Sequence, residues 1–404
     1  MIPYPAIECR IAGVPGEIRP ESSLWHLPLS ERAFDSPRRD TKPAGDASSS
    51  ITIGDYFLAA RDFLLNDGCR MLGKAFWEQT GKRLVSHPRP LTLSLSLEKH
   101  GVFYHPVKVV IKNNDNPLCV LVLNGAVSEP GLALIEEEHL LLSGILGQVA
   151  LPVFPRVYGQ AMVDCGKGDI GFFLGEWFEG FCEFHVSIRN GHSCIAVWGE
   201  QGEVKYFSLD EAAHIYESIS FVLTSAYNLE TCEQIFPWHH AAGDFIVDPD
   251  RILTPSRDGL AVKLITVRGY GVFSVFERDE ENKDISLLVG LLIFFLNLSI
   301  RMQLDKVDGI GETVFLGETV LKATLAGFIK GLDAKEASGC GDLKQAFAKF
   351  ISGFTPEQLL EILDNILEPL QNETRERALI QTNLKGHCRS LYAMLKTQYL
   401  QDFY

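Results

Sequence analysis

The sequence predicts an α+β fold made of two parts, and three observations lead to that expectation. Short apolar segments with strand-like alternation, separated by turn-forming residues, fill the first half and favour an antiparallel sheet with one packed helix. Beyond residue 283 the apolar residues recur at helical spacing, so the C-terminal part should be mainly helical. Between the two lies a short polar segment, Pro237 to Val247, of the kind that presents side chains from a scaffold.

The length of 404 residues allows two to three domains or one two-lobed unit. Residues 1–53 carry Pro, Ser, Arg and Asp without a repeating apolar pattern, which predicts an irregular N-terminal arm. Residues 54–178 should form an N-terminal lobe with a leading helix, the five-stranded antiparallel sheet and one packed helix. Residues 179–404 should form a C-terminal lobe with a hairpin, the polar loop and helices.

The apolar pattern of the N-terminal lobe predicts its individual elements. The leading helix should run from about residue 54 to residue 82, because Phe57, Leu64 and Trp77 fall near helical spacing. The segment 91–97 alternates between leucine and a small hydroxyl residue, as a strand with one apolar face does. The other strands are expected over residues 107–111, 119–123, 156–159 and 171–177, and the packed helix over about 130–146.

The C-terminal lobe should begin with a hairpin over residues 195–207 and a long helix over 210–227. Thr355 and Pro356 form a good helix start, with Thr as the cap and Pro in the first turn. Helices are expected over about 284–304, 317–332, 341–352, 355–370 and 373–399.

Composition argues against several classes of function. The net charge of −15 argues against nucleic acid and anionic membrane as main partners, because both need a basic face. Nine cysteines, odd in number and without a C-x-x-C pair, indicate reduced thiols in a cytoplasmic protein. The most apolar stretch, Ile285–Ile300, contains polar residues and falls short of the ~20 residues that a membrane span needs. The first residues have no features of a signal peptide.

The order of the expected elements is sheet, helix, sheet, connector, helix, polar loop, two short strands and then helices. This order resembles the two-lobed protein-kinase-like fold over roughly residues 88–335. The most similar branch is that of the aminoglycoside and choline phosphotransferases. The resemblance implies an ATP-dependent transfer of a phosphoryl group to a substrate hydroxyl, with ATP and Mg²⁺ as cofactors. The sequence itself leaves both cofactors open.

One position of the N-terminal lobe departs from the pattern of that family and another keeps it. A lysine on the third strand holds the nucleotide phosphates in the family, and here Asn124 stands in its place. Lys108 and Lys112 lie one strand earlier and are candidates to replace it. The following helix supplies Glu138, where the family has a glutamate that orients the lysine.

The connector between the lobes resembles the hinge whose backbone groups grip an adenine. It follows Glu176-Trp177-Phe178, so the resemblance implies Glu176 and Phe178 as positions near a bound nucleotide. Recognition by backbone groups leaves no side-chain signature, and the segment is therefore compatible with ATP without being evidence for it.

The catalytic loop of the family reads His-Gly-Asp, then four residues, then Asn and an apolar strand. The Asp is the base, and the Asn together with a later Asp holds magnesium. Two registers fit this chain. The first keeps the strand intact, with His239 at the position of the base and Asp244 in place of the metal-binding Asn. In the second, Asp244 is the base and Asp250 lies near the metal position.

The later metal-binding Asp of the family ends the next strand, and here Thr266 follows the apolar pair. A hydroxyl is a weak ligand for Mg²⁺, because hard dications need anionic oxygen. Arg268 brings a guanidinium to the same segment. It would either bind a phosphate or pair with Asp244 as a structural salt bridge.

Two other kinds of site are weighed for the polar segment. His239 and His240 are candidate zinc ligands, but adjacent side chains usually diverge and no third ligand lies nearby at helical or strand spacing. Cys232 near His239 offers the ingredients of a thiol hydrolase, without a recognisable nucleophile context.

The substitutions at residues 124 and 266 predict a kinase-fold protein with an atypical or inactive phosphotransferase site. Such a pseudokinase-type module would bind a nucleotide or a small ligand. The alternative is an active ATP-dependent small-molecule phosphotransferase, whose acidic surface suits a cationic or amine substrate. In that case Asp244 would be base or metal ligand, Glu138 a support and Arg268 a phosphate clamp. A second alternative is a non-catalytic interaction scaffold.

Overall fold

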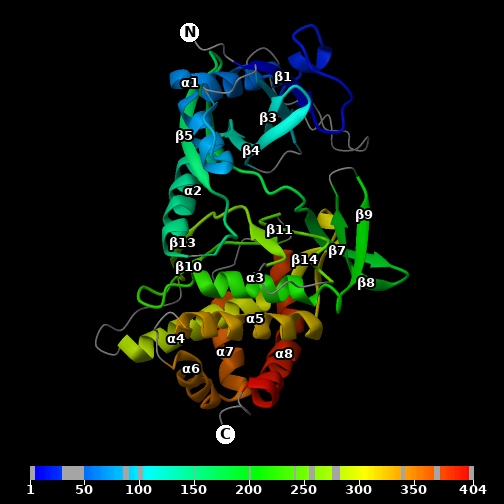
Figure 1. The fold of residues 1–404 in the computed structure, drawn as a ribbon. Helices are drawn as coiled ribbons and strands as arrows, with labels where there is room; N and C mark the ends of the chain where they lie inside the picture. Colours follow the sequence, from blue (N-terminus) through cyan, green and yellow to red (C-terminus); the bar gives the residue numbers. More distant parts are fainter. Residues whose placement is uncertain are drawn as a thin grey trace. The chain divides into compact units, whose positions relative to one another are not determined.

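The computed structural model describes residues 5–29, 50–84, 91–98, 103–149, 151–199, 202–240, 243–253, 260–274, 283–337, 342–367 and 374–399. Residues 30–49 of the expected arm lie outside the described residues. The fold is α+β, as the sequence predicts, and it divides into two compact units (Figure 1). Unit 1 comprises Met1–Gly144 and Pro155–Glu179, and unit 2 comprises Ile145–Phe154 and Gly180–Tyr404.

Unit 1 is built around a six-stranded sheet with the order β1-β2-β3-β4-β6-β5. Its strands are β1 (Ala6–Ile11), β2 (Thr92–Leu97), β3 (Val107–Asn113), β4 (Asn116–Ala126), β5 (Val157–Asp164) and β6 (Asp169–Glu176). Neighbours among β2 to β6 pair antiparallel, whereas β1 pairs parallel to β2. The expectation of a five-stranded antiparallel sheet is therefore wrong, because the sheet is mixed and has a sixth strand.

The strand β1 lies within the segment that composition assigns to an irregular arm. Its residues do alternate, since Ile7, Cys9 and Ile11 are apolar while Glu8 and Arg10 are charged. Cys9 and Ile11 are buried in the core of unit 1. Only six residues carry this pattern and prolines lie nearby, so the local signal for a strand is weak.

Among the described residues, two α-helices accompany the sheet, α1 (Ile53–Thr80) and α2 (Glu129–Gln148), together with the short 3₁₀ helix η1 (Ser23–His26). α1 begins with a capping box in which Thr52 and Asp55 exchange side-chain and backbone hydrogen bonds of 2.8 and 3.1 Å. The helix contacts β4, β5 and β6, and Tyr56 and Phe63 pack on Phe172. The backbone leaves the helical region at Asn66–Cys69, so the single helix expected over residues 54–82 is interrupted there.

Unit 2 combines short strands with helices. Its strands are β7 (Glu183–Arg189), β8 (His192–Trp198), β9 (Val204–Ser208), β10 (Glu233–Ile235), β11 (Phe245–Val247), β12 (Val262–Leu264), β13 (Tyr270–Val272), β14 (Leu304–Lys306) and β15 (Thr313–Phe315). Its helices are α3 (Ala213–Ala226), α4 (Lys283–Arg301), η4 (Val307–Gly309), α5 (Glu318–Ala337), α6 (Leu343–Ser352), α7 (Pro356–Leu367), α8 (Thr374–Met394) and a π-helical turn over Leu395–Tyr399. The sheets are β7-β8-β9, β10-β13, β11-β12 and β14-β15, so the expected hairpin has a third strand, β7.

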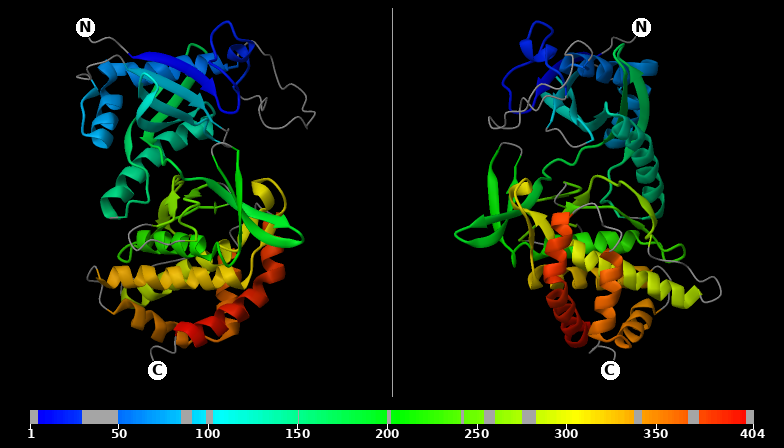
Figure 2. Two further views of the ribbon diagram at one scale, coloured as in Figure 1. Left: turned by 45° about the vertical axis from the view of Figure 1, so that its right-hand side comes forward. Right: turned by 180° about the vertical axis from the view of Figure 1, so that it is seen from behind.

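The helices α3 and α5 lie side by side in the core of unit 2 (Figure 2). Two glycines of α5 allow this close approach. A Cβ added at Gly327 would lie 2.1 Å from the carbonyl oxygen of Glu217, and one at Gly331 would lie 2.5 Å from the Thr224 side chain. Ser220 of α3 donates a hydrogen bond to the Thr324 carbonyl at 2.6 Å, which fixes the helix pair.

The most apolar stretch of the sequence belongs to α4, whose residues from Leu291 to Ile300 are almost all buried. Within the described ranges, none of the helices has both the length and the apolar character of a membrane-spanning segment.

Unit 2 also includes a segment that lies earlier in the chain, Ile145–Phe154. The Val153 carbonyl accepts a hydrogen bond from the Leu264 N–H at 3.0 Å, and the Pro152 carbonyl accepts one from the Lys263 ammonium. The strand β12 therefore has β11 as its partner in the sheet and this segment as a further backbone contact.

Candidate functional site

The polar loop before β11 is folded around the carboxylate of Asp244. The His239 N–H donates to Asp244 Oδ2 at 2.8 Å, and the Gly243 N–H donates to the His240 carbonyl at 3.1 Å. Gly243 has a φ of +74°, a conformation that glycine adopts without strain. The Ile265 N–H donates to the Asp244 carbonyl at 2.8 Å and ties the loop to the segment after β12. The side chain and backbone of Asp244 therefore both organise the loop.

The Asp244 carboxylate forms a two-point ion pair with Arg268. Arg268 Nη2 lies 2.5 Å from Oδ1, and Nη1 donates to Oδ2 at 2.7 Å. The Asp244 side chain is 1% exposed and the Arg268 side chain 26%. Burial raises the pKa of the Asp244 carboxyl, while the charge of Arg268 and the His239 N–H act in the opposite direction. Of the two roles expected for Arg268, the structure shows the salt bridge.

His239 lies next to a carboxylate of α8. Its Nε2 is 4.0 Å from Glu376 Oε2, and both side chains are mostly buried. Burial lowers the pKa of His239 to about 3, and the nearby His240 and Arg301 add to this effect. The imidazole is therefore neutral near pH 7, and so weak a base is poorly suited to accept a proton from a substrate hydroxyl.

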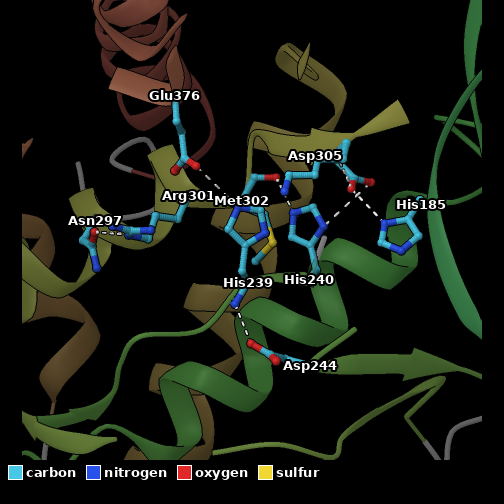
Figure 3. Close-up of polar contacts among 10 residues, drawn as sticks. His185, His239, His240, Asp244, Asn297, Arg301, Met302, Asp305 and Glu376 are labelled. Atoms are coloured by element: carbon cyan, nitrogen blue, oxygen red, sulfur yellow. Dashed lines mark hydrogen bonds and ion pairs between the residues drawn. The ribbon is translucent and has the colours of Figure 1, made fainter. Parts of the chain in front are cut away.

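Deeper in unit 2, one buried carboxylate joins two further histidines (Figure 3). Asp305 of β14 accepts hydrogen bonds from the Val186 and Lys306 N–H groups, each at 2.7 Å, and from His185 Nδ1 at 3.1 Å. His240 Nδ1 lies 3.9 Å from Asp305 Oδ2. Burial acts to raise the pKa of Asp305, but the hydrogen bond from His185, the two histidine charges and the Val186 N–H outweigh it, and the pKa is lowered.

One hydrogen bond places a proton on one nitrogen of each ring. His185 contacts an ionised carboxylate through Nδ1, so the proton lies on that nitrogen. His240 Nε2 is 3.4 Å from the Met302 carbonyl, so this nitrogen carries a proton, while Nδ1 lies toward Asp305. That Nδ1 and the Tyr216 hydroxyl are buried without a hydrogen-bond partner among the described residues. The ring of His240 packs against Phe184 and Tyr216, which hold it in place.

The structure places Asp250, an expected metal position, away from this buried group. Its side chain is 84% exposed and pairs with Lys205 of β9 at 2.8 Å. Among the described residues, no group of three or more His, Cys, Asp and Glu side chains is arranged to hold a metal ion. The adjacent histidines diverge, because His239 faces Glu376 of α8 while His240 faces Asp305 of β14.

Four candidate residues belong to unit 1 and are described separately. Asn124 lies in β4 opposite Phe173, and Glu138 is a buried residue of α2. Glu176 ends β6, and its carboxylate accepts the Arg156 N–H at 3.2 Å. Phe178 follows in the partly buried connector.

The two lysines of β3 both have other contacts in unit 1. Lys108 Nζ lies 4.7 Å from the centre of the Trp177 ring, and Lys112 Nζ lies 3.1 Å from Glu8 Oε2 of β1. These contacts do not favour either lysine as a substitute for the family's lysine, whose position Asn124 occupies.

The Asp244 loop is the part of this site that the local sequence predicts, and most of its surroundings come from distant segments. His185, which carries no local signal of a site in the sequence, is buried in β7. Glu376 and Arg301 were not expected near the loop, and only their positions on neighbouring helices bring them there.

Compared with models of known protein families and with curated proteins, the chain matches none.

Proposed function

We propose that this chain is a kinase-fold protein with an atypical or inactive phosphotransferase site, a pseudokinase-type module that binds a nucleotide or a small ligand. The described elements follow the order on which the resemblance rests. The strands β2 to β4 precede α2, the strands β5 and β6 precede the connector, and α3 precedes the polar loop and the β11–β12 pair. The sheet β7-β8-β9 is inserted between the connector and α3.

The observation that carries the proposal is the ion pair between Asp244 and Arg268. In either register Asp244 is the carboxylate that an active phosphotransferase would use as a base or a metal ligand. Here a guanidinium contacts both of its oxygens, at 2.5 and 2.7 Å. Asn124 and Thr266 stand where a lysine and an aspartate would be needed, and losing such charges typically costs several orders of magnitude in rate.

An active small-molecule phosphotransferase is the second candidate, because Asp244 and the buried Glu138 are both retained. The net charge of −15 would favour a cationic or amine substrate. A non-catalytic scaffold is the third candidate, and it requires no ligand at all.

The test is thermal unfolding of the full chain with ATP or ADP, in EDTA or in Mg²⁺. The proposal expects a stabilisation that persists in EDTA, that Asp244→Asn removes, and that the exposed control Asp250→Asn leaves intact. A shift that requires Mg²⁺, together with consumption of ATP in the presence of small amines, would replace the proposal with the active phosphotransferase. If neither ATP nor ADP changes the unfolding temperature, the nucleotide-binding hypothesis is rejected and the scaffold is favoured.

A further inference from the structure

The cation beside Asp244 is supplied by the chain itself. We propose that Arg268 is a built-in counter-ion that takes the place of the divalent metal ion implied by a kinase-like fold, so that unit 2 folds and binds its ligand without a metal. This inference rests on the proposed function, because only that fold makes a metal at Asp244 the expectation.

With Arg268 in place, the residues around Asp244 do not fit Mg²⁺. The ion requires near-octahedral oxygen ligands at about 2.0–2.1 Å. Asp244 Oδ2 already accepts the His239 N–H and Arg268 Nη1, and Oδ1 faces Arg268 Nη2. Thr266 offers only a neutral hydroxyl, and Asp250 pairs with Lys205 in solvent. No second anionic oxygen of the described candidate residues joins Asp244 at this position.

The guanidinium provides what a buried carboxylate needs. Removing a lone carboxylate from water is costly unless a charge and hydrogen-bond donors compensate it. The planar fork of Arg268 supplies one positive charge and two contacts in a fixed geometry. The Asp244 carboxylate therefore has a cationic partner before any ligand arrives.

The backbone holds Arg268 at this position from both sides. Before it, the Ile265 N–H donates to the Asp244 carbonyl at 2.8 Å. After it, the Phe236 N–H donates to the Gly269 carbonyl at 3.0 Å. Gly269 has no side chain to interfere, since an added Cβ would lie 2.5 Å from the Phe236 carbonyl oxygen. Val267 between these anchors is fully buried. Arg268 is thus part of the packed structure of the loop rather than a long surface side chain.

The test uses metal ions alone, without nucleotide. Thermal unfolding of the full chain is followed with Mg²⁺ or Mn²⁺, against NaCl of equal ionic strength. Wild type should show no metal-specific shift. Arg268→Ala leaves a buried carboxylate unpaired and should lower Tm by roughly 5–15 °C. Mn²⁺ or Mg²⁺ should restore part of that loss, because both Asp244 oxygens then face open space that a cation can fill while water supplies its remaining ligands.

A double variant, Asp244→Asn with Arg268→Ala, separates this effect from general destabilisation. It removes both charges, so it should be more stable than Arg268→Ala and should gain nothing from Mn²⁺. If Arg268→Ala does not fold, Arg268→Gln and its Asp244→Asn double variant provide the same comparison with a better-filled site.

Two results would overturn the proposal. One is a saturable stabilisation of wild type by Mn²⁺ that Asp244→Asn abolishes, since the metal then binds despite Arg268. The other is a folded Arg268 variant that no metal stabilises, since Arg268 then replaces no cation. Because no nucleotide is present, either result is independent of whether the chain binds ATP or ADP.

Discussion

His185 of β7 and Asp305 of β14 are 120 positions apart in the sequence and share a buried hydrogen bond of 3.1 Å between Nδ1 and Oδ1. The same carboxylate accepts the N–H of Val186, the residue after His185. Asp305 therefore attaches the β7-β8-β9 sheet to the β14-β15 pair. His240, next to Asp305 and adjacent in sequence to His239, connects this attachment to the loop that carries Asp244.

Replacing Asp305 by Asn should destabilise the protein markedly. The two carboxylate oxygens of Asp305 accept hydrogen bonds from Val186, Lys306 and His185. The amide of Asn has only one acceptor oxygen, and its NH₂ group would face hydrogen-bond donors. We expect Asp305→Asn to lower the free energy of unfolding by about 3 kcal/mol, measured by denaturant titration. Asp308→Asn is the control, because Asp308 is exposed and its φ of +53° suits asparagine. Equal stability of the two variants would contradict this role of Asp305.

A methyl group at Gly309 should disturb the same attachment. Gly309 in η4 has a φ of +73°, and an added Cβ would lie 2.8 Å from the His185 ring. Gly191 in the β7–β8 turn has a φ of +78° with open space around it. Gly191→Ala should therefore lower the free energy of unfolding by about 1 kcal/mol, through backbone strain alone. Gly309→Ala should lower it by more, roughly 2–3 kcal/mol. Comparable losses would mean that the ring of His185 moves aside freely.

Buried neutral histidines should make stability depend on pH between 6.5 and 4. Burial lowers the pKa of His387 from 6.5 to about 4. Because the folded pKa is depressed, the unfolded chain binds the proton first, and stability is lost as pH falls through this window. His387→Gln should reduce the slope of unfolding free energy against pH by up to about 1.4 kcal/mol per unit.

The control for the pH experiment is His192→Gln, an exposed histidine of β8 that water reaches in both states. Its slope of unfolding free energy against pH is compared with that of His387→Gln. Gln retains a donor for Ser299 Oγ, which lies 3.0 Å from His387 Nε2 and itself donates to the Leu296 carbonyl. Identical slopes for wild type and His387→Gln would show that His387 does not contribute.

The contact between α3 and α5 should be sensitive to a single methyl group. A Cβ at Gly327 would overlap the Glu217 carbonyl oxygen at 2.1 Å, and backbone cannot move as a flexible side chain does. We expect Gly327→Ala to lower the Tm and to reduce the free energy of unfolding by about 1–3 kcal/mol. Gly386→Ala in α8, where nothing lies within 4 Å, should instead stabilise by up to about 1 kcal/mol. Circular dichroism during heating distinguishes the two outcomes.

Elements with a strong local pattern could be predicted from the sequence. The leucine alternation of β2 and the capped start of α7 at Pro356 are examples, and both elements begin within a residue or two of the expected position. β1 and β7 were missed for different reasons. β1 is short and lies among prolines, whereas β7 is held by residues from elsewhere in unit 2, such as His240 against Phe184 and Asp305 against His185.

The candidate site was predictable only where its members are close in sequence. Asp244 and His239 lie five residues apart and were expected together, and the pairing of Asp244 with Arg268 was one of two roles considered. The carboxylates Asp305 and Glu376 reach the loop from distant segments. Burial of such groups depends on tertiary packing, which local patterns do not encode. Asp250, which spacing alone suggested as a metal ligand, is exposed and pairs with Lys205.

The segment Ile145–Phe154 has a practical consequence for anyone dividing the gene. A fragment starting at Gly180 would look like a complete second unit, yet it would lack the carbonyl groups of Val153 and Pro152 that Leu264 and Lys263 require. Translation imposes a related order, because the ribosome makes this piece of unit 2 before it makes β5 and β6 of unit 1. Neither unit can therefore be completed on the ribosome before the other has begun, and a single cut cannot separate them intact.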